Sequence, residues 1–117
     1  MVHIRNAVYI EENTHHFADF VCSDYFFILA EKNNLEDTDK FQQNLQELRI
    51  YFENNPPKTF SNFVDKVSGF SSTIIGLSSY VACFLQDDCL YVKTYGQGEV
   101  YLRRNNMLAS LVRGDAS

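Results

Sequence analysis

The sequence lacks three features that would place it in a common functional class: an excess of basic residues, a long apolar run and an even number of cysteines. Lys and Arg total 10 against 15 Asp and Glu, so the net charge is −5. Nucleic-acid-binding domains and polybasic membrane-surface modules need a basic face, and this balance argues against both. No apolar run reaches the roughly 20 residues that span a bilayer. Residues 1–6 contain no apolar signal core, so we expect a cytoplasmic protein with no membrane partner.

The three cysteines, Cys22, Cys83 and Cys89, all lie in apolar, strand-like runs. Small secreted domains use even sets of cysteines as disulfide frameworks, whereas cytoplasmic proteins keep buried thiols reduced. We therefore predict reduced core thiols. The alternative is a Cys83–Cys89 bridge across a tight hairpin.

Aromatic side chains are abundant, although tryptophan is absent. Ten Phe and seven Tyr contribute to a hydrophobic content of 45% in 117 residues. This content can fill the core of one domain, or of one piece of a larger domain. Because the sequence shows no internal repeat, low-complexity segment or linker, we treat residues 1–117 as one unit.

The last third of the chain alternates β-branched and aromatic runs with clusters of turn-forming residues. This alternation is the signature of consecutive β-hairpins. The segments 86–88, 96–98 and 104–106 are the expected turns, and Gly96 and Gly98 allow a tight one. The pattern predicts a meander of strands at residues 80–85, 89–95, 99–103 and 107–112.

The first third predicts further strands. Residues 2–10 alternate apolar and polar side chains, which indicates a strand. Residues 13–23 are interpreted as a loop or a short edge strand. Residues 25–30 form a continuous apolar run, as expected for a strand that is covered on both faces.

Two helices are predicted between these strand regions. Asp37 or Thr38 can cap the first, and two consecutive prolines from Pro56 end it. Thr59 can cap the second, and Gly69 is its expected C-terminal stop. Apolar residues recur at helical spacing in both helices. They are Phe41, Leu45, Leu48 and Phe52 in the first, and Phe60, Phe63, Val64 and Val67 in the second.

The predicted order is strand, strand, helix, helix and then a strand meander. Residues 70–79 fit either a loop or an early strand. This order predicts an α+β fold, an antiparallel β-sheet meander with two helices packed on one face.

Four metal-capable residues lie close together in the sequence: His15, His16, Asp19 and Cys22. Structural zinc sites favour paired ligands at C-x2-C or H-x3-5-H spacing, which this segment does not have. Adjacent side chains of an extended segment point in opposite directions, so His15 and His16 do not easily share a metal. We therefore interpret the segment as a solvated loop and predict no metal and no other cofactor.

Clustered carboxylates and a Gly-x-Gly turn also have structural explanations. The acids within 36–39 suit the positive end of a helix dipole. Asp87 and Asp88 are common turn residues. The string Gly96-Gln97-Gly98 precedes a strand, whereas a phosphate-binding loop precedes a helix.

Three strings carry a resemblance to a known family: Asn6-Ala7-Val8, Phe27-Ile28-Leu29-Ala30-Glu31 and the segment 90–103. They resemble strings of the metal-dependent (type 2C) serine/threonine phosphatase superfamily. In that family the first string carries an Asp, the second ends in Ala-Asp-Gly and the third contains Gly-Asp-Ser-Arg. The resemblance implies the N-terminal half of a type 2C phosphatase-like sandwich.

The resemblance also implies that catalysis has been lost. The family's core metal-binding acids in this half fall at Asn6 and Glu31, and Lys32 replaces the glycine beside the metal. Gln97 replaces the acid of Gly-Asp-Ser-Arg, and Glu99 replaces its arginine. Two-metal hydrolysis needs several carboxylates, so Asn6, Glu31 and Gln97 are expected to be degenerate metal-site positions, with no catalytic residue among them.

The expected function is that of a catalytically inactive phosphatase-like domain, a pseudophosphatase, with a binding or regulatory role. Its expected partner is a protein, the remaining half of the domain, or a second copy bound through an exposed sheet edge at residues 107–117. The alternative is a small self-contained profilin-like or PAS-like sensor or interaction module. That alternative predicts a pocket between helices and sheet lined by Tyr9, Phe26, Tyr91 and Tyr101. An active metal-dependent protein phosphatase is the least expected function.

Overall fold

The computed structural model describes residues 16–74, 76–87, 89–96, 99–104 and 107–113, and the last two ranges are described as strands only. The strand predicted at residues 2–10 lies outside these ranges. The elements, in chain order, are β1 (Phe17–Cys22), β2 (Phe26–Lys32), α1 (Thr38–Asn54), α2 (Phe60–Ser71), β3 (Leu77–Gln86), β4 (Cys89–Tyr95), β5 (Glu99–Arg104) and β6 (Met107–Arg113).

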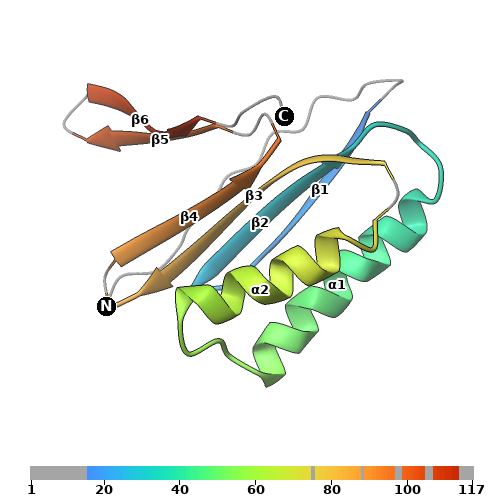
Figure 1. Ribbon diagram of the computed structural model, residues 1–117, viewed down its shortest axis with the longest axis horizontal. Coiled ribbons are helices and arrows are strands. Elements are labelled where there is room, and N and C mark those ends of the chain that lie inside the picture. Colours follow the sequence, from blue (N-terminus) through green and yellow to red (C-terminus); the bar gives the residue numbers. More distant parts are fainter. Residues whose placement is uncertain (1–15, 75, 88, 97–98, 105–106, 114–117) are drawn as a thin grey trace.

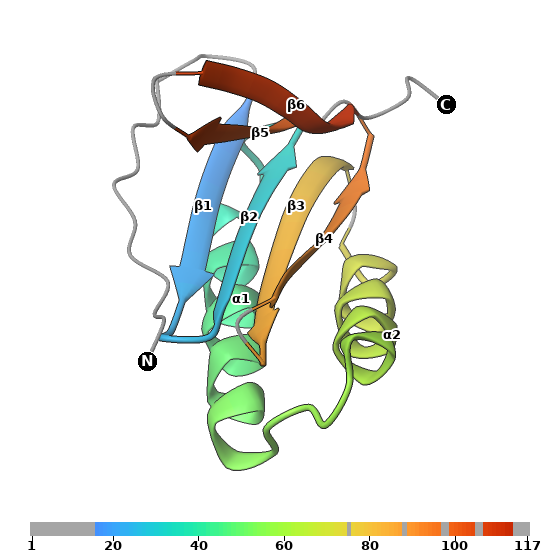
Figure 2. The same ribbon diagram turned by 90° about the vertical axis from the view of Figure 1, so that its left-hand side faces the viewer.

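The main layer is a four-stranded antiparallel sheet with strand order β1-β2-β3-β4. Both helices lie on the same face of this sheet (Figures 1 and 2). The predicted α+β class, with two helices packed on an antiparallel sheet, is therefore confirmed. The helices are inserted between β2 and β3, which are the two central strands.

Side-chain alternation explains how the sheet and helices hold together. In β2, every second residue is buried, beginning at Phe26, and in β3 the buried residues are Tyr80, Ala82 and Phe84. These side chains face the helices, since residues i and i+2 of a strand share one face. Together with buried helix residues they form one core: Val21, Phe26, Ile28, Ala30, Phe41, Leu45, Leu48, Phe52, Phe63, Val67, Tyr80, Ala82 and Phe84.

The helix starts differ in how they are capped. Thr59 caps α2 as predicted, because its hydroxyl oxygen accepts a hydrogen bond of 3.1 Å from the backbone N–H of Asn62. Asp37 occupies the N-cap position of α1, but its φ of 54° places it in the left-handed region and its side chain makes no capping bond. The prediction that Asp37 or Thr38 caps α1 through its side chain is therefore wrong.

The C-terminus of α2 lies beyond Gly69, so the predicted helix stop is also wrong. The helix continues to Ser71 because hydroxyl groups satisfy the carbonyls of its last turn. Ser71 donates to the carbonyl of Ser68 at 2.9 Å, Ser72 to that of Gly69 at 2.8 Å, and Thr73 to that of Phe70 at 2.7 Å. The reversal into β3 is made instead at Gly76, where φ is +82°.

Alanine at position 69 is expected to stabilise the fold. Gly69 lies inside α2, and a Cβ built there meets nothing within 4 Å. A glycine inside a helix costs about 0.5–1 kcal/mol relative to alanine, so Gly69→Ala should raise the free energy of unfolding by about that amount. Urea denaturation followed by far-UV circular dichroism measures this gain. A loss of stability would show that Gly69 is required for packing.

The strands of the second half only partly follow the predicted meander. The β3–β4 hairpin is confirmed, with Gln86 opposite Cys89 and Asp87 at a φ of 54° in the turn. However, β5 pairs only with β6, in a separate two-stranded sheet, and not with β4. The continuous four-strand meander is therefore wrong, and β4 becomes the last strand of the main sheet.

Two further strand predictions are refined. Residues 17–22, interpreted as part of a loop or a short edge strand, form the edge strand β1 and pair with β2 along their whole length. Of residues 70–79, which were expected to be a loop or an early strand, 70–71 end α2 and 77–79 begin β3, and the connection between the two elements lies between them. Within the ranges that the structure describes, no helix is both long enough and apolar enough to cross a membrane.

Candidate interaction surface

The edge strand β4 exposes an unusual amount of apolar surface. Leu90, Tyr91 and Tyr95 are 50%, 40% and 49% exposed. Among the described residues, these are half of the large hydrophobic side chains that are exposed; the others are Leu35, Ile50 and Tyr51. Among the described residues β4 pairs with β3 alone, so its other edge offers backbone groups for hydrogen bonding beside these apolar side chains.

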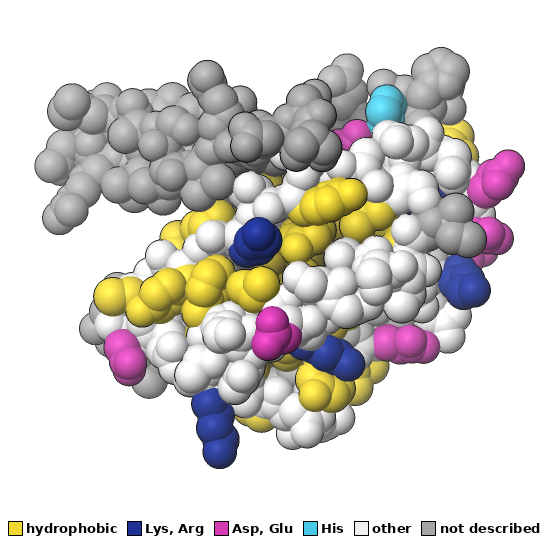
Figure 3. Space-filling model, viewed as in Figure 1, with side chains coloured by type: hydrophobic (Ala, Val, Ile, Leu, Met, Phe, Trp, Pro, Cys, Tyr) yellow, Lys and Arg dark blue, Asp and Glu magenta, His cyan; other side chains and the backbone are white. Residues whose placement is uncertain are grey.

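The aromatic side chains of β4 are held in place by rings that lie deeper. Tyr91 stacks on Phe60 at 5.2 Å between ring centres, and Phe60 lies 6.5 Å from buried Phe84. Tyr95 stacks on buried Tyr80 at 5.6 Å. Figure 3 shows hydrophobic side chains gathered in a band beside α2, on the same side of the molecule as the helices. Because these rings are already packed, binding through them costs little side-chain entropy.

The sheet face opposite the helices is apolar as well. Its rings Phe20 and Phe27 stack at 5.9 Å, from neighbouring strands. None of its residues belongs to the core or to the residues packed against it. We call this the outer face, and its partly exposed apolar residues are Ala18, Phe20, Cys22, Phe27, Leu29, Val81, Cys83, Leu85 and Val92.

The outer face explains an incorrect detail of the sequence interpretation. The apolar run at 25–30 was expected to be covered on both faces, and it does form the strand β2. The helices cover only the face that carries Phe26, Ile28 and Ala30, and the face with Phe27 and Leu29 stays partly exposed. The expected cover is therefore complete only on the helix side, and on the other side Phe27 and Leu29 form part of an apolar outer face.

Glu31 lies at the end of the outer face and pairs with a histidine. The distance from His16 Nδ1 to Glu31 Oε1 is 3.0 Å, and the two side chains are 45% and 41% exposed. Antiparallel pairing of β1 with β2 brings them together, because Phe17 is opposite Lys32. This pair is solvent-accessible, so it contributes little to stability.

The other members of the predicted metal-capable segment do not join His16. Asp19 lies opposite Ala30, whose side chain faces the helices, and its carboxylate accepts a 2.8 Å hydrogen bond from the N–H of Phe20. Cys22 lies on the outer face at the far end of β1. His15 lies outside the described residues. In the described part of the chain, no three His, Cys, Asp or Glu side chains gather as a metal site would require.

The positions that the phosphatase resemblance singles out are only partly visible. Glu31 is the one described member, whereas Asn6 and Gln97 lie outside the described residues. The pairing of β2 with β3 shifts register between Glu31 and Lys32. The side chain of Lys32 lies on the helix side of the sheet, as those of Phe26, Ile28 and Ala30 do. It is 4% exposed, its ammonium group donates to the carbonyl oxygen of Glu36, and it lies 5.9 Å from the centre of the Phe41 ring.

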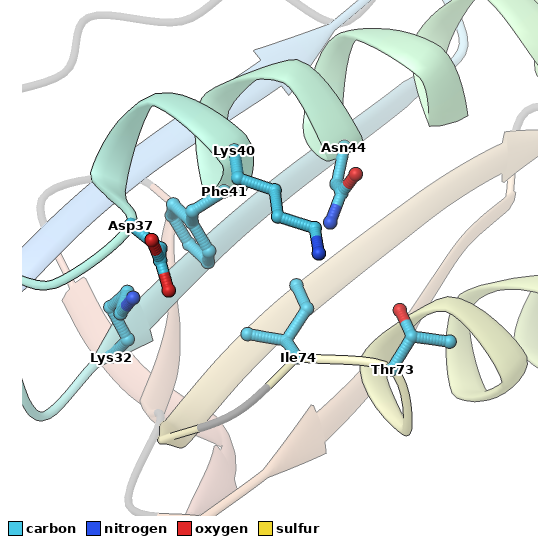
Figure 4. Close-up of a pocket in the computed structure, with 7 residues that line it drawn as sticks. All are labelled: Lys32, Asp37, Lys40, Phe41, Asn44, Thr73 and Ile74. Carbon is cyan, nitrogen blue, oxygen red and sulfur yellow. The ribbon is translucent and has the colours of Figure 1, made fainter.

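A small cavity adjoins Lys32 between the start of α1 and the end of α2 (Figure 4). Its volume is about 60 Å³, enough for a few water molecules but far below an ordinary ligand pocket. Its charged residues have both signs, so it favours neither an anion nor a cation. Its lining residues are Lys32, Asp37, Lys40, Phe41, Asn44, Thr73 and Ile74.

The aromatic pocket expected for a profilin-like or PAS-like module does not form around Phe26. This ring is fully buried and packs against Phe52 at 5.4 Å and Phe63 at 6.3 Å, so core side chains fill the space. Tyr91 lies on the exposed edge strand. The side chains of Tyr9 and Tyr101 are outside the described residues.

The cysteines do not form the alternative bridge. Cys83 is opposite Val92 and Cys89 is opposite Gln86, and neither of these two cysteines forms a disulfide. Burial raises the pKa of the Cys83 thiol above its ordinary value, as expected for a reduced, partly buried thiol. The prediction of core thiols is wrong, because Cys22 and Cys83 are only partly buried, Cys89 is exposed, and none of the three belongs to the core.

Within the described ranges, these side chains offer surfaces for binding, but they do not form a group of catalytic or metal-binding residues. The exposed edge of β4 and the apolar outer face are suited to contact with another polypeptide. Glu31 and His16 form one isolated pair at the rim of the outer face. No family model, no curated protein and no solved structure matches this chain.

Proposed function

We propose that this chain is a catalytically inactive phosphatase-like domain that acts by binding a protein. The observation that carries the proposal is the edge strand β4, on which Leu90, Tyr91 and Tyr95 are each at least 40% exposed. The proposed partner adds a strand to this edge, or is a second copy that does the same.

Two properties of β4 favour binding: its position at the edge of the sheet and its exposed apolar side chains. A strand added at an exposed edge gains main-chain hydrogen bonds, and apolar side chains on that edge provide specificity. Proteins usually protect such edges with charged residues, proline or bulges. Within β4 only Lys93 is charged, and the strand has no proline. The lack of such protection supports a binding role for this edge.

The phosphatase-like part of the proposal rests on element order and on residue identity. The resemblance implies the order strand, strand, helix, helix and strand meander. The strand β2, the two helices and the β3–β4 hairpin agree with this order, whereas the string at Asn6 lies outside the described residues and β5 is not in the main sheet. Two of its three metal-site positions carry amides, at Asn6 and Gln97, and the third, Glu31, pairs with His16. Hydrolysis with two metal ions needs several carboxylates, so these identities support a domain without catalysis.

Photo-crosslinking from β4 tests the binding proposal. A benzoylphenylalanine at position 90 should crosslink to one specific protein or to a second copy, whereas the same group at exposed Gln46 on α1 should not. Leu90→Lys should then weaken binding of that partner about tenfold or more, because a charge at an edge opposes strand addition. Affinity measured by isothermal titration calorimetry, or self-association measured by light scattering, gives the result.

Ile50→Lys is the matched control for this test. Ile50 is 49% exposed, almost as much as Leu90, but lies on α1. It should leave the affinity unchanged. Equal effects of the two substitutions, or no crosslink from position 90, would contradict a β4 interface.

A separate assay addresses catalysis. With Mn²⁺ and p-nitrophenyl phosphate, the chain should hydrolyse no more substrate than its Glu31→Ala variant. Metal-dependent turnover that Glu31→Ala removes would overturn the pseudophosphatase assignment while leaving the β4 interface intact.

A further inference from the structure

A second pocket, with no residue of β4 in its lining, lies where α1 ends and α2 begins. The segment 55–59 joins the two helices at this end of the molecule (Figure 1). The pocket has a volume of about 280 Å³, close to the lower limit for small-molecule sites. Its lining residues are Tyr51, Phe52, Asn55, Pro56, Pro57, Lys58, Asn62 and Lys66.

The pocket combines an apolar floor with an exposed aromatic wall. Phe52 is 1% exposed and stacks on Phe63 at 5.1 Å, so this part of the lining is fixed by the core. Tyr51 is 42% exposed, and Pro56 and Pro57 have no N–H group to offer. A flat apolar group that lies against the two prolines therefore covers no backbone N–H of theirs.

The charged residues in the lining are both cationic. They are Lys58 and Lys66, and no carboxylate lines the pocket, although the whole chain has a net charge of −5. The ammonium group of Lys66 lies 3.9 Å from the centre of the Tyr51 ring. Within the described residues, neither lysine forms an ion pair with an acid.

The backbone at this corner also favours negative charge. Asn62 and Lys66 lie in the first two turns of α2, whose N-terminus carries a partial positive charge. At the end of α1, the Tyr51 carbonyl accepts bonds from the backbone N–H and the side-chain amide of Asn55, at 2.8 and 3.1 Å. Glu53, the acid of α1 nearest to Asn55 in the sequence, pairs with Arg49 at 3.1 Å.

We propose that this pocket binds a small organic anion with a flat apolar body. The anionic group lies between Lys58 and Lys66, and the apolar body lies against Tyr51, Pro56 and Pro57. The site uses none of the exposed residues of β4, so this binding does not depend on the proposed protein interface.

Titration with 2-naphthoate, followed by ¹H–¹⁵N NMR, tests the site. Saturable shifts should appear at the amides of Asn55, Asn62 and Lys66. Acetate supplies the anion without the ring, and 2-naphthalenemethanol supplies the ring without the charge. Each should bind at least about tenfold more weakly than 2-naphthoate. Acetate loses the apolar contact, and 2-naphthalenemethanol loses the charge-assisted contact.

Two variants complete the test. Lys58→Gln/Lys66→Gln should raise the dissociation constant of 2-naphthoate about tenfold or more, whereas Lys40→Gln, an exposed lysine of α1 outside the pocket, should leave it unchanged. The spectrum of the double variant away from the pocket reports that it is folded. Absence of saturable shifts, equal affinity for the neutral alcohol, or equal effects of the two variants would overturn the proposal.

Discussion

Phe63→Ala is expected to lower the free energy of unfolding by about 3–5 kcal/mol, the range for removing a large buried aromatic ring. Phe63 is fully buried, and its ring contacts those of Phe26, Phe52 and Phe84, the last two at 5.1 and 5.0 Å. These rings come from β2, α1 and β3, so Phe63 joins both helices to the central strands. Since small domains are stable by about 5–15 kcal/mol, much of the total would be lost.

Urea denaturation followed by circular dichroism measures this effect, with Phe20→Ala as the control. Phe20 also contacts another phenylalanine ring, but it lies on the outer face and is partly exposed. Its removal should cost clearly less, because it leaves no enclosed cavity. A smaller loss for Phe63→Ala than for Phe20→Ala would show that the helix–sheet interface is not the main core.

Gly96→Ala is expected to have the second largest effect, a loss of about 2–4 kcal/mol from left-handed strain and overpacking together. Gly96 follows β4 with a φ of +74°, a conformation that alanine adopts poorly. An added Cβ would lie 2.3 Å from the backbone oxygen of Ser78 and 3.0 Å from Cβ of Ser79. Because the first contact is with backbone, the end of β4 must move away from β3.

The same denaturation assay applies, and Gly76→Ala is the informative comparison. Gly76 has a similar φ of +82°, but its added Cβ would meet the flexible side chain of Asn34 at 2.8 Å. Gly76→Ala should therefore lose mainly the conformational part of the energy. Equal losses for the two variants would show that φ alone, and not the contact with Ser78, requires glycine at 96.

The core of this fold could be predicted from the sequence because it depends on short-range periodicity. Phe41, Leu45, Leu48 and Phe52 recur every three or four residues, and all four are buried in α1. In α2 the same pattern identifies Phe63 and Val67 as buried. Local spacing is sufficient here because one helix face must meet the sheet.

Strand pairing could not be predicted in the same way. Turn clusters correctly locate the β3–β4 hairpin, but a turn does not establish that the next strand joins the same sheet. After Gly96 the chain leaves the sheet, and β5 pairs with β6 instead. Pairing of strands depends on contacts far apart in the sequence, which local patterns do not contain.

The candidate surfaces were harder still to predict. Every residue of β4 is compatible with a strand. Each face of β4 carries both apolar and polar side chains, so its sequence does not show which face or edge is exposed. Exposure of β4 follows from its place at the end of the sheet order. The one available signal was the run at 25–30, since apolar residues at both parities of a strand indicate apolar surface on both faces. The Lys58–Lys66 pocket depends on how the two helices meet, which spacing within either helix does not specify.

The place of the helices between β2 and β3 also determines the route by which the chain can fold. The β1–β2 and β3–β4 pairs are joined by short turns, so each hairpin can form on its own within microseconds. Pairing of β2 with β3 brings Lys32 opposite Leu77. The chain between these two residues, which includes both helices, then forms a closed loop. Closing the loop between Lys32 and Leu77 costs conformational entropy. The packing of both helices on the sheet offsets this cost. The central pair of the sheet therefore forms last, and substitutions at the β2–β3 contact, such as Ile28→Val or Ala82→Gly, should mainly speed unfolding rather than slow folding.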